Sequence, residues 1–581
     1  MKLVIVESPA KAKKIAGFLG MGWKVEACRG HVRDLPETEL GVNVDENFRP
    51  QYEVLPGKGN LVKRLVKTIR EADEVYLATD PDREGEAIAW HLLQLAGNLK
   101  GKSVYRAVFN AITESAVKAA LAELRPLDEA LVEAQSARRI VDRLVGYLVS
   151  PVACKALDGR LSAGRVQSVA LRLVVERERE IDGFSPETFF TLKARFAVNG
   201  TQFEAHLHRL KDSDVRFTAR EQAEKVVGLL SGASFWVGKA GQTLKLRNPL
   251  PPFTTSSLQQ AAAKGLGLSP EKTMQLAQTL YEQGLITYHR TDGVMVAPEV
   301  QTAAREIILR DYGDAYLPPT PPTYKVKAAN AQEAHEAIRP TDVSRLPEDK
   351  DGDGAKLYAL IWRRFIASQM NPARYTLTGA LIHAGKSTDK PFPLIFKAQG
   401  RELAFDGFLR VYEEPGDGET DDADADGSMP ALKEGLALSL VELPIDEGQT
   451  RPPSRFSEAG LVQALEKYGV GRPSTYASMV SVVKSKGYVT LKQKRLVPTD
   501  TGVKLCDFLV ERFPQVFDVG YTARLEAALD RVAAGSMNQQ DVLSTFWRGF
   551  QPQLKTATEY ALAQVNARQS PKPLVLHPTE E

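Results

Sequence analysis

Short apolar runs and amphipathic stretches alternate over the first part of the chain. Leu3–Val6 and Val75–Thr79 are continuous apolar runs of strand length. Residues 85–96 follow the second run and repeat their apolar side chains at helical spacing. This strand–loop–helix order predicts a mostly parallel α/β domain over residues 1–120.

The hydrophobic period changes several times after residue 120, which predicts further domains. Helical spacing gives way to strand alternation, then to a second helical stretch, to strands again and to a closing helical section. We interpret the returning strands as the second segment of one β-rich domain that is interrupted by an inserted helical domain. The predicted fold is thus a multidomain combination of α/β, α and β parts: 1–120 (α/β), 121–186 with 448–565 (helical), 187–249 with 372–447 (β-rich), 250–371 (inserted helical) and 566–581 (tail).

The closing helical section has the order of a winged-helix module. Ser457 is placed to begin one helix and Pro473 a second, a hairpin-like run follows over 488–497, and a third helix starts near Thr501. Helix, turn, helix and hairpin is a common nucleic-acid-binding arrangement. Such modules also serve as packing units, so the pattern alone leaves both roles open.

Composition excludes several classes of protein. The 581 residues are 43% hydrophobic and 25% charged, and no apolar run approaches the length of a membrane span. The N-terminal apolar run is too short for a secretory leader, so we expect a cytoplasmic protein. Three scattered cysteines without a CxxC pair predict neither disulfides nor a zinc ribbon.

Charge is unevenly distributed along the chain. The formal net charge is +2, but residues 413–428 contain eight acidic residues and no basic one. Without them the rest of the chain carries +10, which permits a polyanionic partner without requiring one. We predict that the acidic segment 413–428 is a disordered loop on the β-rich domain.

The sharpest chemical pattern is the acidic cluster after the second apolar run. Asp80, Asp82 and Glu84 lie between a predicted strand and a predicted helix, and Glu7 ends the first strand. Carboxylates at neighbouring strand ends suit Mg²⁺, which takes few protein ligands and completes its shell with water and phosphate. A solvated acidic loop is the alternative. Lys11 lies close by, at a helix start where it serves either as a phosphate ligand or as a surface charge.

Other patterns are weaker. On a helix over 134–147, the face opposite the apolar stripe carries Arg138, Arg139 and Arg143, with Arg138 and Asp142 spaced as an ion pair. This face is either an ion-paired surface or a comb for phosphates. The glycine spacing before Lys386 fails the P-loop pattern, so we expect no ATP binding. A tyrosine beside an arginine, as at 288–290, is more often packing than catalysis.

Taken together, nine segments resemble bacterial type IA DNA topoisomerases, in the family's order from residue 1 to about 490. They are VIVESPAKAKKI, RGHVRDLP, VLPGK, ATDPDREGEAIAWHL, ARRIVDRLVGYLVSP, LSAGRVQSVALRLVVERERE, LYEQGLITYHRTD, AQEAHEAIRPTD and GVGRPSTYA.

The resemblance implies an N-terminal Toprim domain within a toroidal core. It implies that Tyr288 is the nucleophile of a 5′-phosphotyrosine link, and that Lys11 and Arg290 stabilise the transferred phosphate. The implied metal set for one or two Mg²⁺ ions is Glu7, Asp80, Asp82 and Glu84, with Glu7 also serving in proton transfer. The implied DNA-binding residues are His31, Arg138, Arg139, Asp142, Arg143, Tyr147, Ser162, Ala163, Gly164, Arg165, Val166, Gln167, Gln278, Glu282, Thr287, His335, Arg339, Arg472 and Tyr476.

The implied function is ATP-independent, Mg²⁺-dependent cleavage, passage and resealing of one DNA strand, which relaxes negative supercoils. The expected partner is single-stranded or underwound DNA, bound by a monomer at the nucleoid without zinc. Two rival functions remain: a Toprim nuclease or primase, which needs no Tyr288, and a non-catalytic winged-helix DNA-binding protein.

Overall fold

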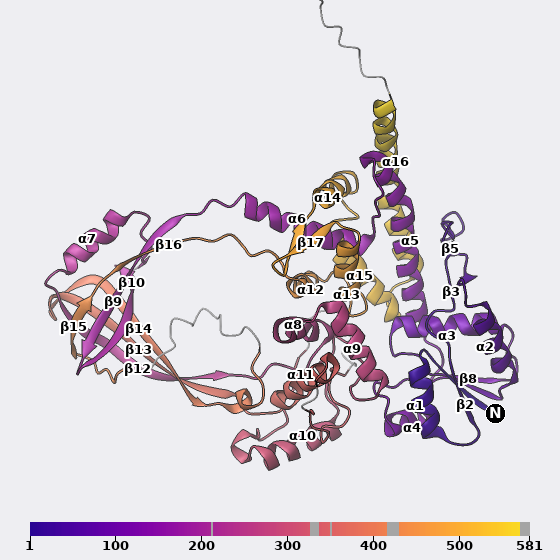
Figure 1. Ribbon diagram of the computed structural model, residues 1–581, viewed down its shortest axis with the longest axis horizontal. Helices are drawn as coiled ribbons and strands as arrows, with labels where there is room; N and C mark the ends of the chain where they lie inside the picture. The colour runs from indigo at the N-terminus through magenta and orange to yellow at the C-terminus, as the bar shows by residue number, and fades with distance from the viewer. Residues whose placement is uncertain (211–212, 326–335, 349–350, 415–428, 570–581) are drawn as a thin grey trace, which may run out of the picture.

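The elements of the chain are arranged as a ring with a helical column on one side (Figure 1). The structure is a computed structural model that describes residues 1–210, 213–325, 336–348, 351–414 and 429–569. Most of the acidic segment predicted to be a disordered loop, at 415–428, lies outside the described residues, as do His335 and the chain beyond residue 569.

The N-terminal part is built on a parallel sheet. Its strands follow the order β2–β1–β7–β8, and β1 pairs in parallel with both β2 and β7. The strands are β1 Lys2–Val6, β2 Trp23–Ala27, β7 Glu74–Leu77 and β8 Ser103–Arg106, and the helices are α1 Pro9–Leu19, α2 Gly59–Glu71, α3 Arg83–Ala96 and α4 Glu114–Ala122. The predicted α/β fold of this region is confirmed, and α3 begins two residues earlier than its apolar spacing indicated.

A short-stranded excursion between β2 and α2 leaves this sheet and lies beside the long helix α5 (Figure 1). Its strands are β3 Arg33–Asp34, β4 Val42–Asn43, β5 Arg49–Pro50 and β6 Glu53–Val54. Leu35, Val42 and Phe48 from this excursion are buried in the core of the helical column. The excursion therefore fastens the α/β part to the column by apolar burial.

The helical column combines an early and a late stretch of the chain. Its elements are α5 Glu129–Leu157, α6 Arg165–Asp182, α12 Glu458–Lys467, α13 Tyr476–Ser485, β17 Val489–Lys492, β18 Arg495–Pro498, α14 Asp500–Arg512, α15 Val519–Ala533 and α16 Gln539–Gln569. The helix–helix–hairpin–helix order of the late stretch matches the sequence pattern. Helix α13 starts three residues after Pro473, because the Thr475 amide donates to the Arg472 carbonyl in a preceding turn. Helix α16 continues four residues into the predicted tail.

The β-rich part is an antiparallel barrel at the far side of the ring from the column (Figure 1). Strands β10–β14–β13–β12–β15–β9 pair in that order, and β9 pairs back to β10, which closes the sheet. Phe196, Phe235 and Phe396 pack against one another inside it. The elements are β9 Thr188–Val198, β10 Thr201–Leu210, β11 Ser213–Asp214, α7 Arg220–Leu230, β12 Ser234–Arg247, β13 Ala373–Ser387, β14 Lys390–Phe405, β15 Ala437–Glu442 and β16 Ile445–Gln449. The sequence pattern did not predict α7.

A helical part is inserted between β12 and β13 and closes the ring. It comprises α8 Thr255–Leu266, α9 Pro270–Glu282, α10 Pro298–Asp311, η1 Asp314–Tyr316 and α11 Asp353–Ser368; a second short helix, η2 Gly407–Arg410, follows β14. Ser269 caps α9 with Pro270 at its first turn, as the sequence predicts. Helix α9 lies against α13 of the column, and α8 lies against α12. The insertion therefore contacts the column although the chain connects it only to the barrel.

In the described ranges, no helix has both the length and the apolar composition that a membrane crossing needs.

Candidate active site

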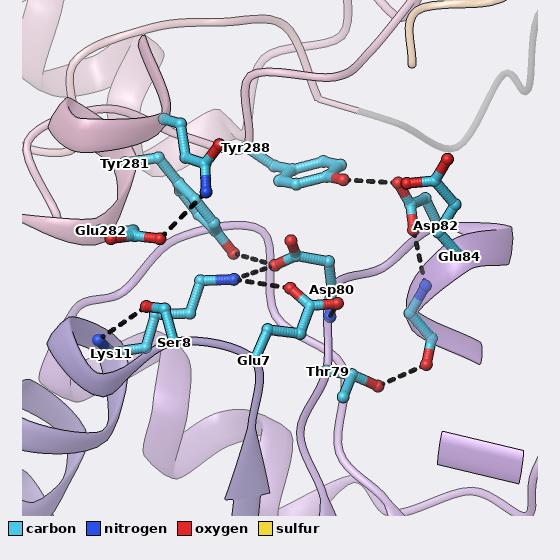
Figure 2. Close-up of polar contacts among 12 residues, drawn as sticks. Glu7, Ser8, Lys11, Thr79, Asp80, Asp82, Glu84, Tyr281, Glu282 and Tyr288 are labelled. Carbon is cyan, nitrogen blue, oxygen red and sulfur yellow. Dashed lines mark hydrogen bonds and ion pairs between the residues drawn. The ribbon is translucent and has the colours of Figure 1, made fainter. Parts of the chain in front are cut away.

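The carboxyl ends of two neighbouring parallel strands bring the first acidic side chains together. Glu7 follows β1 and Asp80 lies three residues beyond β7, and these two strands pair directly. The Glu7 carboxylate accepts a hydrogen bond from the Asp80 amide at 3.3 Å. Figure 2 shows both carboxylates on the side of the sheet edge that faces Tyr281 and Tyr288.

A tight turn over residues 79–85 positions the next acidic residues. The Asp82 carboxylate accepts from the Gly85 amide at 2.8 Å and caps α3, while the Thr79 hydroxyl donates to the Gly85 carbonyl at 2.6 Å. A Cβ on Gly85 would lie 2.2 Å from the Asp80 carbonyl oxygen, which leaves no room for a side chain. The turn requires glycine here, and this requirement explains the glycine between Glu84 and Glu86.

A fully buried arginine supports this turn from below. Arg106 donates to the carbonyls of Leu77 and Thr79 at 2.8 Å and to that of Asp80 at 2.7 Å. Its charge is balanced by Glu86 at 2.9 Å. Since one rigid guanidinium binds three carbonyls between residues 77 and 80, the backbone that presents the carboxylates is preorganised.

Lys11 supplies a buried positive charge between the first two carboxylates. Its ammonium lies 3.0 Å from Glu7, forms an ion pair with Asp80 and lies over the Tyr281 ring at 5.1 Å. Burial opposes its charge, but Asp80 and Glu7 hold the pKa of Lys11 above its ordinary value. Burial and the negative charge of Glu7 raise the pKa of Asp80 to about 7, against the opposite effect of Lys11.

Tyr288 comes from the inserted helical part and faces the carboxylates across the boundary with the N-terminal α/β part, which we call the seam. Its hydroxyl donates to Asp82 at 2.6 Å, and its backbone amide donates to the Asn110 carbonyl at 2.7 Å (Figure 2). Arg290 donates to Glu84 at 2.7 Å and lies 3.7 Å from Asp82. Burial and the charge of Asp82 hold the pKa of Tyr288 well above its ordinary value, so the phenol is protonated in this state.

Two further aromatic residues complete the site, and the sequence reasoning missed both. Tyr281 donates to Asp80 at 3.5 Å and packs edge-to-face on Tyr288 with ring centroids 5.3 Å apart. His289 is buried beside both rings, and burial with the Arg290 charge lowers its pKa to about 3. Both belong to the segment LYEQGLITYHRTD, but helical spacing marks Tyr281 only as a core residue, and nothing in the sequence distinguishes it.

The predicted metal ligands divide into two ion-paired sets. Glu7 and Asp80 pair with Lys11, whereas Asp82 and Glu84 converge on Arg290. Within the described residues, no three His, Cys, Asp or Glu side chains form a group that could hold a metal ion among themselves. The donors are nevertheless hard oxygens, and Mg²⁺ commonly binds one or two carboxylates together with water and substrate phosphate. The set therefore fits Mg²⁺ if substrate phosphate completes the coordination.

The predicted arginine comb on α5 faces the N-terminal excursion. Arg139 binds Asp34 through two bonds of 2.8 Å, and Arg143 donates to the Leu35 carbonyl at 3.3 Å. Tyr147 donates to the Thr38 carbonyl at 2.9 Å. These contacts place the comb at the boundary between the α/β part and the column.

The expected pair between Arg138 and Asp142 is wrong. Arg138 contacts Glu526 of α15 at 3.2 Å, and Asp142 instead accepts from Arg165 at 2.8 Å. Arg165 is fully buried between Asp142 and Glu526. Helical spacing allows the first pair, but a distant carboxylate in a drier environment competes for Arg138.

The other predicted DNA-binding residues occupy different environments. Thr287 and Arg339 are buried and bonded to each other's segments, and Gln278 donates to Glu282 at 3.2 Å on the open side of α9. Gln278 also lines a cavity of about 250 Å³ between α9 and α13. Around the start of α6 and the start of α13, Ala163, Gly164, Val166 and Tyr476 are buried, whereas Ser162, Gln167 and Arg472 are partly exposed. His31, between β2 and β3, is also partly exposed.

Comparison with known proteins identifies the family. The DNA topoisomerase family model matches residues 126–544 and the Toprim domain model matches residues 2–112. DNA topoisomerase 1 of Zymomonas mobilis is 43% identical over 98% of this chain, and that of Rickettsia bellii is 43% identical over 97%. The chain spans 47% of the length of the first relative and 72% of the second.

A solved structure agrees with these matches. Full-length topoisomerase I from Thermotoga maritima superposes with a TM-score of 0.82 and 36% identity, covering 95% of this chain and 90% of that one. Its fold match extends over both the N-terminal Toprim domain and the ring. The chain therefore belongs to the bacterial type IA DNA topoisomerase family.

Proposed function

We propose that this chain cleaves one DNA strand through Tyr288, allows strand passage and reseals the break without ATP, relaxing negative supercoils. The observation that carries the proposal is the hydrogen bond of 2.6 Å between the Tyr288 hydroxyl and Asp82, 206 residues away and in a different part of the ring. Tyr288, a residue type that serves as a nucleophile in covalent catalysis, thereby lies against a carboxylate cluster that suits phosphoryl transfer.

The chemistry is a reversible transesterification. The Tyr288 oxygen attacks a backbone phosphorus and forms a bond to it. The phosphorus stays bonded to the 5′ oxygen of one DNA fragment, and its bond to the 3′ oxygen of the other fragment breaks. The phenol proton passes to Asp82, which already accepts the hydrogen bond of this hydroxyl. The 3′ oxygen takes a proton from the site as it leaves. Because the phosphodiester is exchanged for a phosphotyrosine ester, resealing is the same reaction in reverse and needs no nucleotide.

Cationic side chains on both sides of the seam would stabilise the charge on the transferred phosphate. Lys11 lies on the N-terminal side and Arg290 beside Tyr288. Both are now paired with carboxylates, so a bound phosphate would replace part of those pairs. Glu7 contacts Lys11 and the Asp80 amide rather than Tyr288, so its proposed proton transfer concerns the leaving 3′ oxygen.

We propose that Mg²⁺, one or two ions, is held by carboxylates of the set Glu7, Asp80, Asp82 and Glu84. The ion would supply positive charge at the phosphate and help position the cleaved ends. The pKa of Asp80 is raised first by burial and then by the charge of Glu7, and a bound cation would oppose both effects.

Single-stranded or underwound DNA is the proposed substrate, bound by a monomer at the nucleoid in the cytoplasm. The residues proposed to position the strand are those named from the family motifs, of which Gln278, Glu282, Arg139, Arg143 and Arg472 keep polar atoms at or near the surface. The buried members Thr287 and Arg339 would act through the backbone segments that they hold, and Arg165 through the carboxylates of Asp142 and Glu526.

A covalent-adduct assay tests the proposal. The protein is incubated with a labelled single-stranded oligonucleotide and Mg²⁺, denatured and separated, with the expectation that label stays on the protein. Tyr288→Phe should abolish the adduct. Tyr358→Phe is the matched control, because Tyr358 is also a buried tyrosine of the inserted part but donates to the Arg345 carbonyl. Free 5′ ends without adduct would indicate a nuclease, and binding without cleavage a passive DNA-binding protein.

A further inference from the structure

A buried cluster of charges joins the Toprim domain to the helical column. We call it the arginine cluster; it lies between α3, α5, α6, the start of α13 and α15. Its cations outnumber its anions by one, and its members are Arg83, Arg138, Arg165, Arg472, Asp142, Glu526 and Asp530.

Asp530 bridges the two cations that come from opposite sides of the boundary. One carboxylate oxygen accepts from Arg83 of α3 and the other accepts from Arg472, which precedes α13. These three side chains keep 15–17% of their surface exposed. Part of this bridge is therefore in contact with solvent.

Glu526, one helical turn earlier on α15, is in a different position. Its side chain is 0% exposed and lies against Arg138 and Arg165. Burial alone would raise its pKa, but Arg138, Arg165 and Arg472 lower it to about 2. Glu526 is therefore a fully buried counterion of the cluster, whereas Asp530 is a partly exposed one.

The cluster also contains donors that the protein does not use. Among the described residues, Nη1 of Arg83 and Nη1 of Arg165 are buried without any hydrogen-bond acceptor. An unused buried guanidinium donor is costly unless a ligand satisfies it in another state. A phosphate diester in a DNA backbone resembles a carboxylate in this respect, because each offers two acceptor oxygens and one negative charge.

Building on the proposed function, we propose that Arg83 and Arg472 form a seat for a DNA backbone phosphate and that Asp530 fills this seat in the absence of DNA. The incoming phosphate displaces the Asp530 carboxylate and takes over its two cationic partners. Arg83 lies between Asp82 and Glu84 in the sequence. Occupation of the seat by DNA is thereby transmitted to the carboxylate turn of the active site.

The test measures DNA binding separately from cleavage. All variants are made in the full chain carrying Tyr288→Phe, without Mg²⁺, and titrated with a single-stranded oligonucleotide at several salt concentrations. Asp530→Asn keeps the shape but removes the competing charge, so it should bind about tenfold more tightly. Asp507→Asn, which removes a carboxylate paired with Arg179 on the surface, should leave affinity unchanged.

Arg83→Gln tests the seat without altering Asp530. It should weaken binding and reduce the slope of log affinity against log salt by about 0.7, the value for one phosphate contact on a single strand. Combining it with Asp530→Asn should cancel the gain of the latter. Equal or weaker binding by a folded Asp530→Asn variant, or an unchanged slope for Arg83→Gln, would overturn the proposal.

Failure of this inference is distinguishable from failure of the proposed function. The adduct assay depends on Tyr288 and detects cleavage, whereas the titrations detect binding by a chain that lacks this hydroxyl. A protein that forms the adduct but shows no effect at Arg83 and Asp530 would retain the enzyme assignment and lose the phosphate seat.

Discussion

Buried charge at the carboxylate cluster is balanced one side chain at a time. Lys11 is the cation shared by Glu7 and Asp80. A substitution that removes one of these three charges leaves a buried charge without compensation. Burial and the charge of Glu7 keep the pKa of Asp80 raised even with Lys11 in place. The site is therefore a place where an added cation has a measurable effect on stability.

Lys11→Met should lower the melting temperature in the absence of divalent ions and increase the stabilisation by Mg²⁺. The two carboxylates lose their internal cation, so binding of an external one to the folded state contributes more. The check is a thermal melt of both proteins with and without MgCl₂ at constant ionic strength. An equal Mg²⁺ effect on both would contradict the prediction.

His91 gives a pH dependence of defined sign. It accepts from Arg33 at 2.5 Å, and burial with the Arg33 charge lowers its pKa to about 3. In the unfolded chain the His91 side chain binds a proton below its ordinary pKa of about 6.5, whereas in the folded chain it stays neutral down to about pH 3. The free energy of unfolding is therefore unaffected by His91 above about pH 6.5 and decreases as the pH falls from there to about 3. His91→Gln keeps an acceptor but cannot titrate. Its melting temperature should fall less than that of the parent between pH 7 and pH 5.

Residue identities at the site were predictable where a motif names them. The acidic residues were predicted from their place at two strand ends, whereas Tyr288 and Arg290 were assigned roles only through segments that resemble the family; the structure brings them together. Asp530 was not predictable, because it lies outside these segments and pairs with a residue 447 positions away. Sequence spacing carries information on local partners only, which is also why the pairing of Arg138 was wrong.

Among the elements, the turn before α3 shows how local packing controls the site. Gly85 sits in the first turn of α3 with its Cα facing the Asp80 carbonyl, and the Asp82 cap fixes the start of the helix. Apolar spacing predicted the body of α3, but the first two helical residues are polar and were assigned to the loop. Caps and turns depend on side-chain hydrogen bonds that periodicity does not report.

Gly85→Ala should abolish adduct formation and destabilise the protein by about 1–3 kcal/mol, because the added methyl group overlaps the Asp80 carbonyl. Gly17→Ala is the matched control within α1, where a Cβ meets nothing within 4 Å. That change should stabilise the protein by about 0.5–1 kcal/mol through helix propensity. Denaturant unfolding and the adduct assay measure both; full cleavage by Gly85→Ala would refute the steric argument.

At the level of the whole molecule, two polar seams close the ring. The inserted part meets the Toprim domain through Tyr288 and Arg290, and it meets the column through Ser256 bonded to Glu466 at 2.7 Å and Ser481 bonded to Glu271 at 2.7 Å. The order of helical and β-rich parts was predictable from hydrophobic period. The closure of the barrel and the seams was not, because both depend on contacts between distant segments.

Ser256→Ala should loosen the seam with the column. Ser256 is buried, whereas its acceptor Glu466 is exposed, so losing this hydrogen bond should cost about 0.5–1.5 kcal/mol. Hydrogen exchange should become faster in α8 and α12 while the barrel is unchanged. Ser485→Ala is the control, because that hydroxyl is exposed and bonds only to the Val482 carbonyl. Uniform acceleration in both variants would argue against a seam effect.

The seam between Tyr288 and Asp82 has a consequence for the protection of the proposed covalent intermediate from hydrolysis. In the proposed reaction the nucleophile Tyr288 belongs to the inserted part and the carboxylates belong to the Toprim domain, so opening the ring at this seam would separate the reacting groups. A phosphotyrosine exposed during that interval would have neither acid nor metal beside it to promote attack by water. On this proposal, the architecture would allow cleavage and resealing only while the ring is closed, and would protect the phosphotyrosine from hydrolysis while the ring is open.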